Sequence, residues 1–224
     1  PQRAVTLDEF RRAGKKLFLL THSEMYYTDA LLTHLFRGEG GVWAVRGWSR
    51  FFFGRPDDCP VAADEDGDGA DEAAVFRSGE GLWAFRDRTR FFFGSPGDWP
   101  VPGGYGTAEG GELPAVFRPA QGLWAVRGLT RFHFGEAGDW PVPGGYGSST
   151  AWDGAVFRPS RGLWAARNVT RFSFGSAPDI PVPAAYAGRP ADVMGVFRPS
   201  TGLWAVRGAT RFHFGSSGDR PVTR

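Results

Sequence analysis

Short stretches in which apolar and polar residues alternate recur along the chain. In the stretch TRFHFG, Phe212 and Phe214 fall on one side of an extended backbone, whereas Arg211 and His213 fall on the other side. The neighbouring stretches GVFRP, GLWAVRG and DRPV are equally short and rich in aromatic and β-branched residues, and they are separated by Pro, Ser and Gly. This pattern predicts β-strands of a few residues joined by tight turns.

One tryptophan marks a unit that occurs five times. Successive members of this tryptophan column are 40, 41, 40 and 40 residues apart: Trp43, Trp83, Trp124, Trp164 and Trp204. A Phe-Arg pair precedes each of these tryptophans, and a Phe-Gly pair and an aspartate follow it. Four short strands in a repeat of about 40 residues are typical of a propeller blade. We therefore expect an all-β fold, a five-bladed β-propeller over residues 31–224, in which the tryptophan column is structural.

The Pro-Val strand at the end of each unit suggests how the ring is built. If each such strand forms the inner strand of the next blade, Pro221 and Val222 have no following blade and return to the first one, beside residues 31–37. Residues 17–23 are a second candidate for that position. The ring would then be closed across its termini, because unpaired sheet edges are a liability.

Residues 1–30 do not fit the repeat and form an N-terminal extension. Thr6 followed by Glu9 matches a capping box, which predicts a short helix through about Lys16. A cap on the ring, a linker, or a docking or plugging element are all compatible with such a helix.

One strongly acidic stretch, ADEDGDGADE at residues 63–72, follows the first Pro-Val strand. Calcium takes about six to eight hard oxygen ligands, and carboxylates at alternate positions around a glycine turn supply several of them. The candidate ligands are the side chains of Asp64, Asp66 and Asp68, the carbonyl of Ala70, and Asp71 or Glu72. A solvated acidic turn without metal is the alternative. Later units carry Gly, Ala, Ser or Arg at the aspartate positions, so we expect a single calcium site.

The order of a Pro-Val strand, an Asp-rich loop, AVFR, a tryptophan strand and a closing Phe-Gly resembles the FG-GAP and VCBS-type repeats of integrin-α-like β-propellers. The resemblance covers residues 32–222, and the acidic loop matches the DxDxDGxxD calcium motif of that family. It implies a secreted or cell-surface, extracellular propeller that serves in adhesion. The motif matches well only once, which puts in doubt any function that needs calcium in several blades.

The later units replace the acidic loop with glycine-rich or alanine-rich turns that carry a tyrosine. These tyrosines and two nearby tryptophans are candidate ligand-binding residues on one rim: Trp99, Tyr105, Trp140, Tyr146 and Tyr186. Repeated aromatic rings can stack on sugars, as in multivalent lectins, and they can equally serve as packing at the turns.

Charge and cysteine content narrow the possible functions. The net charge is only +2 and the basic residues are spread evenly, which does not favour a nucleic-acid partner. Apolar runs are far shorter than the roughly 18 residues that cross a bilayer, so membrane insertion is not expected. The single cysteine, Cys59, rules out an internal disulfide.

Catalysis is not predicted, because the four histidines lack a repeated carboxylate or serine partner. A glycosidase is a minor alternative, and it would need an unequal carboxylate pair drawn from Glu109, Glu112, Glu136 or Asp153. We expect a non-catalytic recognition propeller that binds a glycan or a protein at a surface. A structural or display domain of a larger surface protein or appendage, with no ligand of its own, is the alternative.

Overall fold

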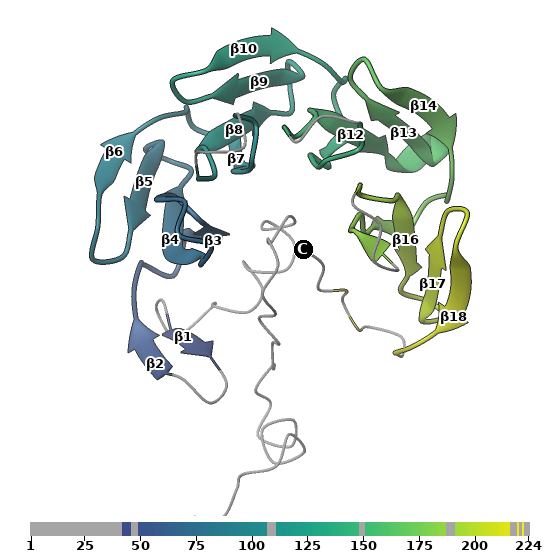
Figure 1. Ribbon diagram of the computed structural model, residues 1–224, viewed down its shortest axis with the longest axis horizontal. Helices are drawn as coiled ribbons and strands as arrows, with labels where there is room; N and C mark the ends of the chain where they lie inside the picture. The colour runs from purple at the N-terminus through teal and green to yellow at the C-terminus, as the bar shows by residue number, and fades with distance from the viewer. Residues whose placement is uncertain are drawn as a thin grey trace, which may run out of the picture.

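The computed structural model describes residues 42–45, 49–106, 111–147, 151–186, 191–215, 219 and 221. They form a β-propeller arrangement in which four-stranded antiparallel sheets, the blades, follow one another along an arc (Figure 1). Within each blade the strands occur in sequence order, from an inner strand near the centre of the arc to an outer strand at its edge.

The blades contain the following strands. The first has β3 (Cys59–Ala63), β4 (Glu72–Arg77), β5 (Leu82–Phe85) and β6 (Arg90–Phe92). The second has β7 (Trp99–Pro100), β8 (Ala115–Arg118), β9 (Leu123–Val126) and β10 (Thr130–His133). The third has β11 (Trp140–Pro141), β12 (Ala155–Arg158), β13 (Leu163–Ala166) and β14 (Thr170–Ser173). The fourth has β15 (Ile180–Pro181), β16 (Gly195–Arg198), β17 (Leu203–Val206) and β18 (Thr210–His213).

The expectation of five blades is wrong. The described residues form four four-stranded blades, and the first unit adds only a two-stranded hairpin, β1 (Val42–Val45) and β2 (Ser49–Phe52). The reason is that each blade combines two successive units: β3 belongs to the first unit and pairs with β4 of the second. Five units that share strands in this way give four complete blades.

The role of the Pro-Val strand as the inner strand of the next blade is confirmed. Strands β7, β11 and β15 each pair antiparallel with the first strand of the following unit, as β3 does. The predicted return of Val222 to residues 31–37 lies outside the described residues, as does the helix predicted within residues 1–30. In the described part, the only helical segment is a 3-10 turn, η1 (Pro159–Arg161), and nothing there is a helix long and apolar enough to cross a membrane.

The tryptophan column forms the core of the blades. Trp83, Trp124 and Trp164 are fully buried, at 0% exposure. Each donates its indole N–H, over 2.9 Å, to the carbonyl of the phenylalanine before the closing glycine: Phe93, Phe134 and Phe174. This bond satisfies the polar atom of a large apolar side chain inside the core. The side chain of Trp43 lies outside the described residues.

Buried ion pairs join successive units. The aspartate after each Phe-Gly pair accepts two hydrogen bonds from the arginine of the next Phe-Arg pair: Asp58–Arg77, Asp98–Arg118, Asp139–Arg158 and Asp179–Arg198. In the third pair, Asp139 Oδ1 lies 2.6 Å from Arg158 Nε, and Oδ2 also accepts the backbone N–H of Glu136. These hydrogen bonds to Asp139 raise the pKa of the Arg158 guanidinium. The bidentate geometry fixes the spacing between neighbouring units.

A cation–π contact joins neighbouring blades. The arginine that follows each tryptophan strand lies over a phenylalanine of the preceding outer strand, as Arg127 does over Phe91 at 3.9 Å and Arg207 over Phe172 at 3.8 Å. Phe212 is the equivalent ring of the fourth blade, and it is 43% exposed. The face of the fourth blade that would meet a following blade is therefore partly exposed at Phe212.

Candidate functional site

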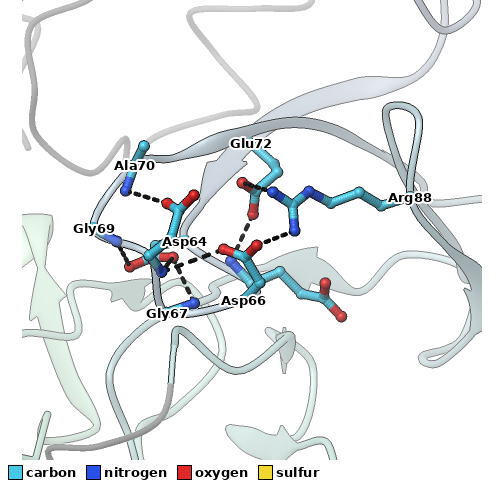
Figure 2. A network of polar contacts seen from close by, with 9 residues as sticks. Asp64, Asp66, Gly67, Gly69, Ala70, Glu72 and Arg88 are labelled. Atoms are coloured by element: carbon cyan, nitrogen blue, oxygen red, sulfur yellow. Dashed lines mark hydrogen bonds and ion pairs between the residues drawn. The ribbon is translucent and has the colours of Figure 1, made fainter.

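The acidic loop connects β3 and β4 of the first blade. Ala63 pairs with Glu72 at its base, so the loop projects from the end of a hairpin. Asp64 organises it: Oδ1 accepts the backbone N–H groups of Gly67 and Asp68 at 2.7 and 3.0 Å, and Oδ2 accepts that of Gly69 at 3.0 Å (Figure 2). Gly67 and Gly69 have φ of 76° and 86°, a left-handed conformation that favours glycine.

Three of the six predicted ligands come together in this loop. One carboxylate oxygen each of Asp64, Asp66 and Glu72 lies within 4.8 Å of the others. Asp68 instead accepts the backbone N–H of Ala70 at 2.8 Å, and Asp71 is exposed. Three converging carboxylates are hard oxygen donors of the kind that calcium prefers, so the residues present fit that ion.

An arginine contacts two carboxylates of this cluster. Arg88, in the turn between β5 and β6, donates a hydrogen bond to Asp66, and its Nη2 lies 3.0 Å from Glu72 Oε1 (Figure 2). The hydrogen bond from Arg88 lowers the pKa of Asp66 below its ordinary value. Burial, by contrast, raises the pKa of Glu72. The sequence motif did not reveal Arg88, because it comes from another strand pair.

A comparison between units links Arg88 to the acidic loop. The other units carry apolar residues at this turn position: Trp48, Leu129, Val169 and Ala209. The arginine therefore occurs in the same blade as the acidic loop and in no other unit. It supplies part of the positive charge that the loop requires.

The predicted aromatic residues are tied into the turns. The hydroxyl groups of Tyr105, Tyr146 and Tyr186 each donate to the backbone carbonyl four residues earlier, over 2.8, 2.6 and 2.7 Å. Tyr105 is 8% exposed, whereas Trp99 and Trp140 are half-buried on inner strands. Burial raises the pKa of Tyr186 to about 12. In these blades, a side-chain-to-backbone bond of a tyrosine thus holds the turn that stands in the position of the acidic loop.

A cavity of about 530 Å³ lies between the second and third blades. The turn between β9 and β10 and the turn between β13 and β14 line it, together with Tyr105, Phe132 and residues 152–154. The ring of Trp152 meets Tyr105 edge-on, with centroids 6.4 Å apart. We call this cavity the interblade pocket.

The interblade pocket lies where the repeat changes. The segment Trp152, Asp153 and Gly154 corresponds to Glu112, Leu113 and Pro114 in the second blade, since Asp153 and Leu113 occupy equivalent bridges. The fourth blade has Asp192, Val193 and Met194 there. A Cβ atom at Gly154 would lie 2.7 Å from the ring of Phe132, so a glycine is needed where that ring approaches.

Asp153 is the acidic group of this pocket. Its Oδ2 accepts the backbone N–H of Gly147 at 3.0 Å, and burial raises its pKa. Arg167 and Asn168 lie on the adjacent β13–β14 turn of the same blade, where the backbone N–H of Arg167 donates to the carbonyl of Gly154, and Arg167 also covers the ring of Phe132 at 4.4 Å. The sequence indicated Asp153 only as a possible member of a catalytic carboxylate pair, and Trp152 was missed. The signal for Trp152 was present, because the equivalent positions carry Glu112 and Asp192.

The other polar residues considered for catalysis that the structure describes have structural contacts, whereas Glu109, His22 and His34 lie outside the described residues. His133 and His213 make the same contact, with Nδ1 3.1 Å from a turn carbonyl in their own blades. Glu136 pairs with Arg158 at 3.1 Å. Glu112 is buried, and its backbone N–H donates to Asp64 in the acidic loop.

A scan of protein-family models finds no match to this chain, and searches of curated proteins and of solved structures find none either. The class defined by the fold is a β-propeller with four described blades. The likeness to FG-GAP and VCBS-type repeats rests on the acidic motif and the order of the strands.

Proposed function

We propose that this chain is a non-catalytic recognition module that binds a glycan or a protein on its rim, and that its acidic loop holds one structural calcium ion. The observation that carries the proposal is the interblade pocket. Its walls combine aromatic rings with a carboxylate, an amide and a guanidinium, which is a common composition for binding sites.

The repeated side chains and the side chains of the pocket have different contacts, and this difference supports recognition over catalysis. The residues that recur in every unit form the indole bonds, the Asp–Arg pairs and the cation–π contacts. They are therefore used by the scaffold, and one of them, Arg167, also lines the interblade pocket. Asp153, the acidic group of the pocket, is bonded to a backbone N–H and belongs to the segment that differs between blades.

The acidic loop supports a stabilising role for calcium. The ion would be held by Asp64, Asp66 and Glu72, whose oxygens already converge, and it would neutralise their mutual repulsion. Binding of the ion would require Arg88 to give up at least one of its contacts, the hydrogen bond to Asp66 or the ion pair with Glu72. Because calcium is abundant outside cells, we propose an extracellular or cell-surface location.

A structural or display role is the second candidate. It is favoured by the rim tyrosines, whose hydroxyl groups are all bonded to backbone carbonyls. Under this alternative the ring supports other parts of a surface protein and binds nothing itself.

A glycan array distinguishes the two candidates. The chain is applied with calcium and, separately, with a chelator. Recognition predicts binding to a restricted group of glycans in at least one of the two conditions. A blank array under both conditions, together with no protein captured from a panel of surface proteins, would contradict the recognition function and favour the display role.

A further inference from the structure

We infer that the interblade pocket is a binding site for a neutral sugar, with Trp152 as the aromatic platform and Asp153, Arg167 and Asn168 as the groups that bind hydroxyls. This inference rests on the proposed recognition function and specifies its ligand. The cavity of about 530 Å³ is in the size range of small-ligand pockets and fits one or two sugar rings.

The shape and chemistry of the walls match a sugar. A sugar ring has apolar faces of C–H groups and an edge of hydroxyls, so it needs a flat apolar surface beside donors and acceptors. Trp152, which is half-buried, supplies aromatic surface from an inner-strand loop, and the buried ring of Tyr105 packs edge-on against it. Asp153 supplies acceptors, and Asn168 and Arg167 supply donors from the neighbouring turn of the same blade.

The charges favour a neutral ligand. Asp153 and Arg167 contribute one charge of each sign, so the pocket carries no excess that would select a charged sugar. The Asp153 carboxylate accepts hydrogen bonds from sugar hydroxyls, and its charge offsets that of Arg167, which alone would favour an acidic sugar.

The departure from the repeat is an independent observation. A residue needed only for the blade would recur, as the tryptophan column does. Trp152, Asp153 and Gly154 instead differ from both equivalent segments, although the backbone bridge is the same in all three blades. The sequence has therefore changed the side chains at one blade boundary while keeping the scaffold.

The chain offers matched variants for a test. Asn168 has φ of 61°, and the equivalent turns carry Gly128 and Gly208, so Asn168→Gly removes the amide without straining the backbone. Arg167→Ala and Arg127→Ala each remove an arginine that covers a phenylalanine ring, but only Arg167 lines the pocket. Arg127→Ala is therefore the control.

The experiment measures binding of lactose, cellobiose and methyl α-D-mannopyranoside by calorimetry, with N-acetylneuraminic acid as the charged comparison. We expect at least one neutral sugar to bind the wild-type chain. Asn168→Gly and Arg167→Ala should weaken that binding about tenfold, as the loss of one or two hydrogen bonds would. Trp152→Ala should abolish it, and Arg127→Ala should leave it unchanged.

Three results would overturn the inference. In the first, the glycan array is positive but Asn168→Gly and Arg167→Ala bind sugar as well as the wild type does, or the control Arg127→Ala loses as much binding as they do. The ligand then binds elsewhere, and the recognition function survives. Binding of the charged sugar alone would also exclude a neutral-sugar site. If the array and all four sugars are negative, the recognition function fails together with the pocket.

Discussion

At the scale of single residues, the acidic loop shows how one blade departs from the shared framework. Asp64 uses both carboxylate oxygens to hold the loop backbone, whereas Asp66 and Glu72 face Arg88. The motif in the sequence predicted the aspartates and Glu72. It could not predict Arg88, because the two segments meet only when the hairpins β3–β4 and β5–β6 pair.

Calcium should raise the melting temperature of the wild-type chain by a few degrees, because a ligand that binds only the folded state stabilises it. Asp66→Ala should remove that increment, since one of the three converging carboxylates is lost. Differential scanning calorimetry with calcium and with chelator measures both. An identical melting curve with saturating calcium would contradict the site.

Arg88→Leu, which copies the residue of the next unit, should increase calcium affinity about tenfold, because the ion no longer competes with a guanidinium. The pKa of Asp66 should also rise toward its ordinary value, because the hydrogen bond from Arg88 now lowers it. Calorimetry and carboxylate NMR measure the two effects. Arg131→Leu, at an exposed arginine of the second blade, is the control. Weaker calcium binding by Arg88→Leu would show that Arg88 supports the ion.

At the scale of strands and blades, the repeated contacts could largely be predicted from the sequence. Alternation located the strands, and the repeat marked a column of aspartates without identifying the partner of each aspartate. The partner is the arginine of the next Phe-Arg pair, which approaches because the Pro-Val strand crosses into the next blade. Local sequence patterns identify the strands well. Which arginine pairs with which aspartate depends instead on how strands of successive units combine into one sheet.

Asp139→Ala should lower the free energy of unfolding by about 3 kcal/mol, because it leaves Arg158 without its buried bidentate partner and uncaps a turn. Glu136→Ala removes an exposed partner of the same arginine and should cost less than about 0.5 kcal/mol. Urea denaturation of the two variants measures the difference. Equal losses of unfolding free energy in the two variants would show that the Asp139–Arg158 pair stabilises the chain no more than the exposed pair does.

At the scale of the whole molecule, the arc of blades differs from the ring that the repeat suggested. Counting tryptophans gives five units, yet shared strands leave four complete blades and a hairpin. The interblade pocket was also missed, because it joins turns of two blades that are distant in sequence. The change from Glu112 and Asp192 to Trp152 was the available signal.

Two equivalent phenylalanines differ in how far they are covered, because the fourth blade lies at the end of the arc. Phe172 lies under Arg207 and packs on the core of the third blade, whereas Phe212 is 43% exposed. Phe172→Ala should therefore destabilise the chain by about 3 kcal/mol, and Phe212→Ala by about 1 kcal/mol or less. Thermal and urea unfolding of both variants test this. Equal destabilisation would indicate that something covers the fourth blade in solution.

The most direct measurement is a proton–nitrogen NMR spectrum of the tryptophan indole groups, recorded while the neutral sugar that binds best is added. The chain has nine tryptophans, and Trp83, Trp124 and Trp164 are fully buried in the blades. A sugar in the interblade pocket should shift the indole resonance of Trp152 and leave those of Trp83 and Trp164 unchanged, whereas Trp124 stacks on Phe132 of the pocket wall and is not used as a reference. Shifts at Trp99 or Trp140 with none at Trp152 would contradict binding in the pocket and would direct attention to the repeated rim.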